Sequence, residues 1–136
     1  MKKENTAYIT LTDMNFQKEV VESQLSVLVE FGADWCGTCH ILAPMIEELM
    51  AEYEGKFAVG RVDVDQNKVI TMQYGIRELP TLLFLKEGQV GDHIIGVVPK
   101  SVLSEKLLGV LEMGRPMIFE SSSVYGPTFM KGICRI

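Results

Sequence analysis

The sequence predicts an α/β domain built on a mixed β-sheet that carries helices on both faces. Stretches with the periodicity of strands and of helices alternate along the chain, in the order βαβαβαββα. The alternating part favours parallel strands, and the two adjacent strands near its end favour an antiparallel hairpin. With 136 residues, of which 47% are hydrophobic and 23% charged, the chain is long enough for one domain with a sizeable core.

The first half of the chain is expected to form two strands, each followed by a helix. Residues 8–11 alternate between apolar and polar side chains, as a short strand does. Asp13 is expected to cap the helix that follows it. Residues 27–31 form a run of strand formers, and apolar side chains then recur at helical spacing over residues 36–53.

The second half adds a third strand, a short helix, a hairpin and a last helix. Residues 57–64 form the expected strand, and residues 65–74 the short helix that a glycine ends. Residues 81–85 and 90–95 are joined by a polar, glycine-containing segment, which is typical of a β-hairpin. Ser101 is expected to cap the final helix, whose apolar positions continue to the end of the predicted domain.

Two cysteines lie where the second strand passes into its helix. Cys36 and Cys39 are three apart, so on a helix they share one face and reach disulfide distance. The first turn of a helix has unpaired N–H groups and a positive dipole end, which favour a thiolate. With Cys36 at the N-cap, its sulfur is expected to accept hydrogen bonds from the N–H groups of Thr38 and Cys39. Cys36 is expected to be the exposed thiol and Cys39 the shielded one.

Charge and hydropathy exclude several classes of partner. The net charge is −5, and no basic run with interleaved aromatic residues is present, so no nucleic-acid partner is expected. No apolar stretch is long enough to span a bilayer, so no membrane partner is expected. Lys2 and Lys3 precede polar residues rather than the apolar core of a signal peptide, which predicts a cytoplasmic protein. In that compartment a C-x-x-C motif is redox-active rather than structural.

Four separated motifs resemble the thioredoxin family, in the same order and over residues 6–114. They are Trp35-Cys36-Gly37-x-Cys39, Val62-Asp63-Val64-Asp65-Gln66-Asn67, Tyr74-Gly75-Ile76-Arg77-x-x-Pro80-Thr81, and Gly96 after the hairpin. The resemblance implies a thioredoxin fold with a central five-stranded mixed sheet. It also implies a monomeric protein-disulfide reductase that needs no cofactor or metal and serves electron transport and cell redox homeostasis. Its expected partners are disulfide-bearing proteins and, as electron donor, a flavin-dependent thioredoxin reductase.

The resemblance also implies roles for single residues. Cys36 attacks a substrate disulfide, and Cys39 resolves the mixed disulfide that forms. Glu30 lies among apolar residues in the strand that leads to the dithiol, and with the resemblance it is expected to accept the proton of Cys39. Arg61 is expected to support this transfer by pairing with Glu30 and holding it ionised.

A substrate-binding surface is expected around the dithiol. The resemblance places a cis Leu79-Pro80 peptide bond against the cysteines, although most such bonds are trans. The residues expected to contact the substrate are Trp35, Gly37, Thr38, Leu79, Pro80, Ile95, Gly96 and Val97.

Several residues depart from the usual pattern of the family. Thr38 stands where a proline is usual, and His40 where lysine or arginine is frequent. Glu30 replaces a buried aspartate, Gly32 a large aromatic residue, and Arg61 a lysine. These departures leave open a less reducing exchanger, such as an oxidant or isomerase. A non-catalytic binding subunit with this fold is a further alternative.

Haem attachment and zinc binding are two further alternatives for the cysteine motif, and the C-terminal tail has no assigned role. Cys36-Gly37-Thr38-Cys39-His40 fits the C-x-x-C-H pattern of haem attachment, but the motif follows a core strand without an export signal. A zinc site would have to draw on Cys134, His40 and His93 in place of a second cysteine pair. Residues 115–136 form a tail of unknown role, in which Cys134 is expected to be a free thiol rather than a third redox cysteine.

Overall fold

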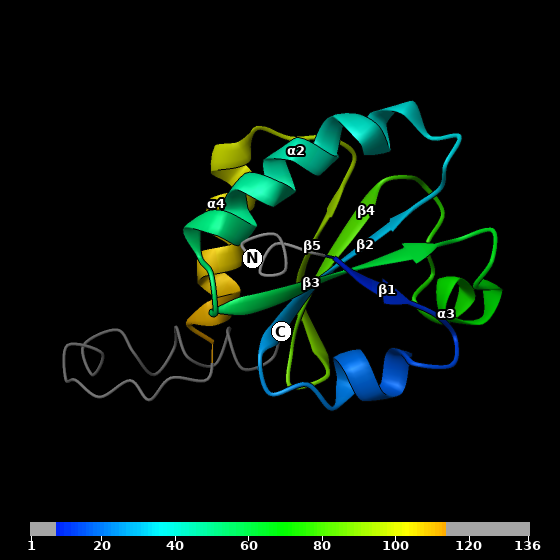
Figure 1. The fold of residues 1–136 in the computed structure, drawn as a ribbon, viewed down its shortest axis with the longest axis horizontal. Coiled ribbons are helices and arrows are strands. Elements are labelled where there is room, and N and C mark those ends of the chain that lie inside the picture. Colours follow the sequence, from blue (N-terminus) through cyan, green and yellow to red (C-terminus); the bar gives the residue numbers. More distant parts are fainter. Residues whose placement is uncertain (1–7, 114–136) are drawn as a thin grey trace, which may run out of the picture.

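Five strands form one mixed sheet in the computed structural model of the protein, which describes residues 8–113 (Figure 1). The strands are β1 (Ile9–Leu11), β2 (Ser26–Gly32), β3 (Phe57–Asp63), β4 (Thr81–Lys86) and β5 (Gln89–Ile95). Their order across the sheet is β1-β3-β2-β4-β5. Strands β1, β3 and β2 run parallel to one another, whereas β4 is antiparallel to both β2 and β5. The predicted five-stranded mixed sheet is therefore confirmed.

Helices cover both faces of this sheet, as predicted. The helical elements are η1 (Gln17–Val21), α2 (Gly37–Glu52), α3 (Lys68–Gln73) and α4 (Lys100–Leu111). Helices α2 and α4 pack on one face, where Leu42 and Leu103 join the same core as Leu28 of β2. Elements η1 and α3 pack on the other face, where Val20 and Ile70 are buried. The first helix differs from the expectation in being a single five-residue π-helical turn.

Strand β2 is the centre of the domain, because all seven of its residues are buried. Successive side chains of a strand point to opposite faces, so Leu28 and Glu30 share one face while Val29 and Phe31 lie on the other. The core clusters agree, since Leu28 packs with α2 and α4, and Val29 and Phe31 pack with η1 and α3. Glu30 therefore points toward the layer that contains α2, the helix that carries the dithiol.

The structure corrects both predicted helix caps. The carboxylate of Asp13 accepts hydrogen bonds from the N–H groups of Val69, at 3.4 Å, and Ile70, at 2.9 Å. Asp13 therefore satisfies the first turn of α3, 56 residues further along the chain, rather than the helix next to it. Helix α4 begins at Lys100 with Pro99 as its N-cap, so Ser101 lies inside the first turn. The fixed φ of proline suits this entry into a helix, and no side-chain cap is present at Pro99.

The hairpin between β4 and β5 turns over only two residues. Glu87 has φ of 53° and Gly88 has φ of 80°. Positive φ at both central positions is typical of the two-residue turns that join antiparallel strands. Among the helices that the structure describes, none has the length and hydropathy required to cross a membrane. The predicted tail and Cys134 lie outside the described residues.

Candidate active site

The two cysteines of the C-x-x-C motif form a disulfide at the start of α2. Their Cα atoms are 5.3 Å apart. Cys36 is the N-cap, with extended backbone angles of −89° and 105°, and its sulfur accepts a hydrogen bond from the N–H of Cys39 at 3.1 Å. The prediction of a dithiol at a helix N-terminus is therefore confirmed. The exposed N–H groups of the first turn favour negative charge at this position.

The expected difference in exposure between the two cysteines is absent in this disulfide form. Each cysteine is only 6% exposed. What differs is their surroundings, because Cys39 lines a cavity and Cys36 does not. The sulfur of Cys36 also lies 3.4 Å from the hydroxyl oxygen of Thr38.

Thr38 contacts this sulfur in a way that differs from the sequence-based expectation. Both the Thr38 and the Cys39 N–H groups were expected to donate to it. Only the Cys39 N–H does so within hydrogen-bond distance, and the Thr38 hydroxyl supplies the second polar contact. A threonine at this position thus brings a side-chain group to Cys36 that a proline would lack.

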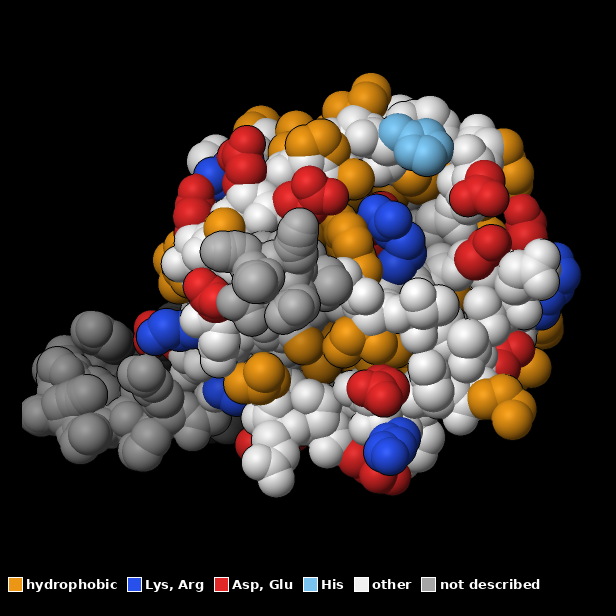
Figure 2. Space-filling model, viewed as in Figure 1, with side chains coloured by type: hydrophobic (Ala, Val, Ile, Leu, Met, Phe, Trp, Pro, Cys, Tyr) orange, Lys and Arg blue, Asp and Glu red, His pale blue; other side chains and the backbone are white. Residues whose placement is uncertain are grey.

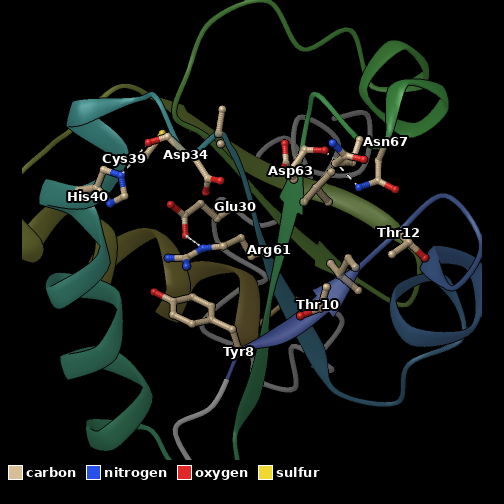
Figure 3. A pocket seen from close by; sticks show the side chains of 15 residues that line it. Tyr8, Thr10, Thr12, Glu30, Asp34, Cys39, His40, Arg61, Asp63 and Asn67 are labelled. Atoms are coloured by element: carbon tan, nitrogen blue, oxygen red, sulfur yellow. Dashed lines mark hydrogen bonds and ion pairs between the residues drawn. The ribbon is translucent and has the colours of Figure 1, made fainter.

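Glu30 is a buried carboxylate close to the dithiol. It is 1% exposed, and its Oε1 accepts a hydrogen bond from Nε of Arg61 at 3.2 Å (Figure 3). The parallel pairing of β2 with β3 places Glu30 directly opposite Arg61, which explains the contact. Burial raises the pKa of the Glu30 carboxyl above its ordinary value, and the Arg61 guanidinium opposes that rise.

Tyr8 holds the other side of the same guanidinium, a contact that the sequence analysis did not foresee. The Cζ atom of Arg61 lies 4.0 Å from the centre of the Tyr8 ring. The Tyr8 hydroxyl donates to the carbonyl oxygen of Ala43 in α2 at 3.4 Å. Burial first, and the Glu30 carboxylate second, raise the pKa of Tyr8 to about 12. Tyr8 therefore stays neutral and ties Arg61 to α2.

A cavity of about 580 Å³ lies between α2 and the parallel edge of the sheet (Figure 3). Its lining includes Tyr8, Glu30, Gly32, Cys39, His40 and Arg61. A Cβ atom placed on Gly32 would lie 3.0 Å from the sulfur of Cys39 and 3.9 Å from Oε2 of Glu30. The absent side chain of Gly32 therefore leaves space that both reactive groups face.

The exposed apolar side chains near the dithiol include Trp35. Its ring is 69% exposed, yet Nε1 donates a hydrogen bond to Oδ2 of Asp65 at 2.7 Å. Asp65 lies just after β3, so the end of that strand fixes the orientation of the ring. The sequence analysis quoted Asp65 within a family motif but gave it no role.

The predicted cis bond precedes Pro80, as the resemblance implied. The carbonyl oxygen of Pro80 accepts a hydrogen bond from the N–H of Gly96 at 2.8 Å. Gly96 has φ of 90°, a conformation that favours glycine. Its neighbours Ile95 and Val97 are 53% and 37% exposed. Strand pairing thus joins the cis proline to two exposed apolar side chains.

The remaining substrate-surface candidates are also accessible, except Pro80, which is buried. Gly37 and Thr38 are exposed in the first turn of α2, and Leu79 is half-buried before the cis bond. Within residues 8–113, the acidic, histidine and cysteine side chains form no group of three that could hold a metal ion. His40 instead directs its Nε2 to the carbonyl oxygen of Asp34 at 3.1 Å.

Comparison with known proteins agrees with this geometry. The family model named Thioredoxin matches residues 7–108. A thioredoxin of Chlorobaculum thiosulfatiphilum is 46% identical over 100 residues, which cover 74% of this chain and 93% of that protein. Thioredoxin 1 of Nostoc sp. is 45% identical over 102 residues, which cover 75% of this chain and 95% of that protein. The chain belongs to the thioredoxin family. It is a protein-disulfide oxidoreductase that reduces disulfides by dithiol–disulfide exchange through Cys36 and Cys39.

One further thioredoxin relative comes from a plant organelle. The chloroplastic M-type thioredoxin of Spinacia oleracea is 44% identical over 97 residues, which cover 71% of this chain and 54% of that protein. The family membership implies disulfide-bearing proteins as substrates and a thioredoxin reductase as partner. Thioredoxins carry out this exchange with their own cysteines.

Proposed function

We propose that Cys36 is the nucleophile and Cys39 the resolving cysteine of this thioredoxin-family reductase. The Cys36 thiolate attacks one sulfur of the substrate disulfide, forms a mixed disulfide and expels the other substrate sulfur as a thiolate. Cys39 then attacks Cys36 Sγ, closes the protein disulfide and releases the second substrate thiolate. The observation that carries the proposal is the contact of Cys36 Sγ with the Cys39 N–H and the Thr38 hydroxyl, both of which stabilise a thiolate.

Glu30 takes the proton from Cys39 in this proposal. The carboxylate and the sulfur both lie within 4 Å of one point in the cavity, the position of a Cβ atom on Gly32. A water molecule spans such a gap and carries a proton between the two groups. The raised pKa of Glu30 makes it a better base than an ordinary carboxylate. Arg61 supports the transfer because its Nε stabilises the ionised form.

The disulfide-bearing segment of a protein substrate binds across the exposed surface beside Cys36. This surface is supported by the exposed apolar side chains of Trp35, Ile95 and Val97. Gly37, Thr38, Leu79 and Gly96 complete it, and the buried Pro80 supports it through the hydrogen bond to Gly96.

The proposal extends to the electron donor, the location and the domain limits. A flavin-dependent thioredoxin reductase returns the Cys36–Cys39 disulfide to the dithiol, so the chain serves electron transport in the cytoplasm as a monomer. Residues 6–114 constitute the redox domain, which the match of the family model to residues 7–108 supports. Removal of residues 115–136 is expected to leave insulin reduction unchanged.

Trapping experiments with insulin test the proposed roles. Cys39→Ser retains the attacking thiol and accumulates a mixed disulfide between Cys36 and insulin, which mass spectrometry identifies. Cys36→Ser loses insulin reduction and traps no insulin chain. An insulin adduct on Cys39 of Cys36→Ser would reverse the two roles. The reduction potential, measured by equilibration with glutathione, separates a reductase from a less reducing exchanger.

A further inference from the structure

The charged side chains of α2 are confined to one half of the helix. Residues 37–46, the half that begins at the dithiol, contain no aspartate, glutamate, lysine or arginine, whereas Glu47, Glu48 and Glu52 follow in the other half. The solvent-facing side of a helix normally carries charged residues. Figure 2 shows apolar side chains along α2, at the top of the view, with a histidine beside them. The half of α2 next to the dithiol therefore presents an uncharged surface.

Ile41 is the large apolar side chain that this half of α2 exposes. It is 56% exposed. Gly37 and Thr38 lie four and three residues before it, so the three residues share one face of the helix. Helical side chains lean toward the N-terminus, which directs Ile41 over the turn that holds Gly37 and Thr38. The hydroxyl oxygen of Thr38 lies 3.4 Å from the sulfur of Cys36. Ile41 thus lies one helical turn from the reactive sulfur.

Gly37 leaves room between Ile41 and the dithiol. A Cβ atom placed on Gly37 would have no neighbour within 4 Å among the described residues. The absence of acidic residues from the first turn of α2 suits the chemistry, because a carboxylate beside Cys36 would oppose its ionisation. That reason concerns charge alone and would be met equally well by a serine or threonine at position 41. An exposed isoleucine that adjoins a reactive sulfur therefore indicates contact with a partner.

We propose that Ile41 is a specificity-determining residue, which receives an apolar side chain next to the reactive cysteine of a protein substrate. This inference rests on the proposed attack by Cys36. The substrate surface proposed above takes from α2 only its first two residues, and Ile41 extends this surface by one turn. An apolar substrate side chain that packs on Ile41 removes apolar area of both partners from water, which favours binding. A polar side chain there loses its contact with water and gains no hydrogen-bond partner from isoleucine.

Two peptides test this preference in the full chain that carries Cys39→Ser. Each peptide holds its one cysteine as a mixed disulfide with thionitrobenzoate, and leucine flanks the cysteine in one peptide and serine in the other. Attack by Cys36 on the peptide sulfur releases the coloured thiolate, which gives the rate. Mass spectrometry of the digested protein separates a peptide on Cys36 from one on Cys134. Ile41→Ser is expected to lower the ratio of the leucine rate to the serine rate by about fivefold.

The ratio and a matched substitution isolate the contact. A change in the ionisation of Cys36 alters both rates and cancels in their ratio. Leu108 of α4 is 42% exposed and lies one turn before Leu111, whose carbonyl oxygen accepts a hydrogen bond from Lys86 at the end of β4. The dithiol follows the end of β2 that lies beside the first residue of β4, so Leu108→Ser is expected to leave the ratio unchanged.

The outcomes separate this inference from the proposed function. A peptide adduct on Cys36 whose rate ratio is the same with and without Ile41→Ser would overturn the inference alone. An equal fall of the ratio in Leu108→Ser would also overturn it, because the effect would not depend on the position beside the dithiol. If neither peptide attaches to Cys36, the proposed nucleophile is wrong, and the role of Ile41 falls with it.

A second measurement leaves Ile41 intact. In the trapped mixed disulfide with the leucine peptide, nuclear Overhauser effects are expected between the methyl groups of Ile41 and those of a peptide leucine. These effects report direct contact and do not depend on any rate. Effects from the peptide leucines to Trp35 or Ile95, with none to Ile41, would place the apolar side chains elsewhere and overturn the assignment.

Discussion

The guanidinium of Arg61 lies between the ring of Tyr8 and the carboxylate of Glu30. Its Cζ atom is 4.0 Å from the centre of the ring, and its Nε is 3.2 Å from Oε1 of the carboxylate. Glu30 lies in β2 and Arg61 in β3, which are adjacent parallel strands. Tyr8 directly precedes β1, the parallel strand on the other side of β3. The aromatic ring thereby positions the cation that partly offsets burial of the carboxylate.

Replacement of Tyr8 is therefore expected to change the pKa of Glu30 through Arg61, without direct contact between Tyr8 and Glu30. Tyr8→Leu removes the ring, so Arg61 is held less firmly, and the pKa of Glu30 is expected to rise further. The free energy of unfolding should fall by about 0.5–1 kcal/mol, as for an exposed cation–π contact. NMR titration of the Glu30 carboxyl carbon measures the first effect. Tyr8→Phe keeps the ring and is the control; a pKa that is the same in both variants would contradict the positioning role.

Two glycines offer a matched test of packing. A Cβ atom on Gly60 in β3 would lie 2.3 Å from Cδ1 and 2.7 Å from Cγ of the buried Leu11. Gly60→Ala is therefore expected to lower the free energy of unfolding by about 1–3 kcal/mol. Gly109 lies at an exposed position in the middle of α4, where an added Cβ atom would have no neighbour within 4 Å. Gly109→Ala should therefore raise the free energy of unfolding by about 0.5–1 kcal/mol. Urea denaturation compares the two, and equal effects would show that contact with Leu11 is not the cause.

The sequence predicts the elements of this fold better than it predicts the contacts between them. The apolar run of β2 and the helical spacing of α2 are local patterns, and both elements are found where they are expected. Asp13 shows where local reasoning fails. It has the side chain of an N-cap, but the partners that it binds, Val69 and Ile70, are adjacent only after β1 and β3 have paired.

The same limit applies to the candidate site. The cysteine spacing was readable from a motif, whereas the cis bond before Pro80 and the Glu30–Arg61 pair were expectations from the resemblance. The stacking of Tyr8 on Arg61 depends on the register of β1 against β3, which alternation alone does not give. The space beside Gly32 depends on how close α2 lies to the end of β2. The sequence signal for it was Gly32 in the place of a large aromatic residue of the family.

Replacement of Glu30 tests its function as a base. Glu30→Gln has nearly the same shape and can still accept from Arg61, but it cannot take a proton from Cys39. The resolution of the mixed disulfide is expected to slow by about 10²-fold, with the first attack on substrate largely unchanged. Stopped-flow kinetics separate the two steps. An unchanged rate of resolution would leave Glu30 with only a structural role.

The same substitution has a pH-dependent effect on stability. Burial raises the pKa of Glu30 in the folded state above its unfolded value, so the folded protein binds this proton more tightly. The stability from this group is fully present below the unfolded pKa and is lost as the pH rises through the folded pKa. Glu30→Gln lacks this loss and should be more stable above that range by about 1–2 kcal/mol. Denaturant titrations at several pH values measure it; a constant difference across pH would contradict the linkage.

The hydroxyl of Thr38 is expected to set the redox poise of the dithiol. It lies 3.4 Å from the sulfur of Cys36, and among residues 8–113 the other hydrogen-bond partner of that sulfur is the Cys39 N–H, at 3.1 Å. A donor at the sulfur stabilises the thiolate and therefore the reduced protein, which raises the reduction potential. For a two-electron couple, about 1.4 kcal/mol corresponds to about 30 mV.

Three substitutions of Thr38 separate the hydroxyl from the backbone. Thr38→Val keeps the N–H and the shape but lacks the hydroxyl, and it is expected to lower the reduction potential by tens of millivolts, about the strength of one hydrogen bond to a charged group. Thr38→Pro lacks both donors and should also make the protein more reducing, whereas Thr38→Ser keeps the hydroxyl and should change little. Equilibration with glutathione gives the three potentials. Thr38→Val and Thr38→Pro both lack the hydroxyl, but they differ in the backbone N–H and in the rigidity that proline adds. If the reduction potential of Thr38→Val equals that of the unmodified protein while that of Thr38→Pro differs, the backbone rather than the hydroxyl controls the potential.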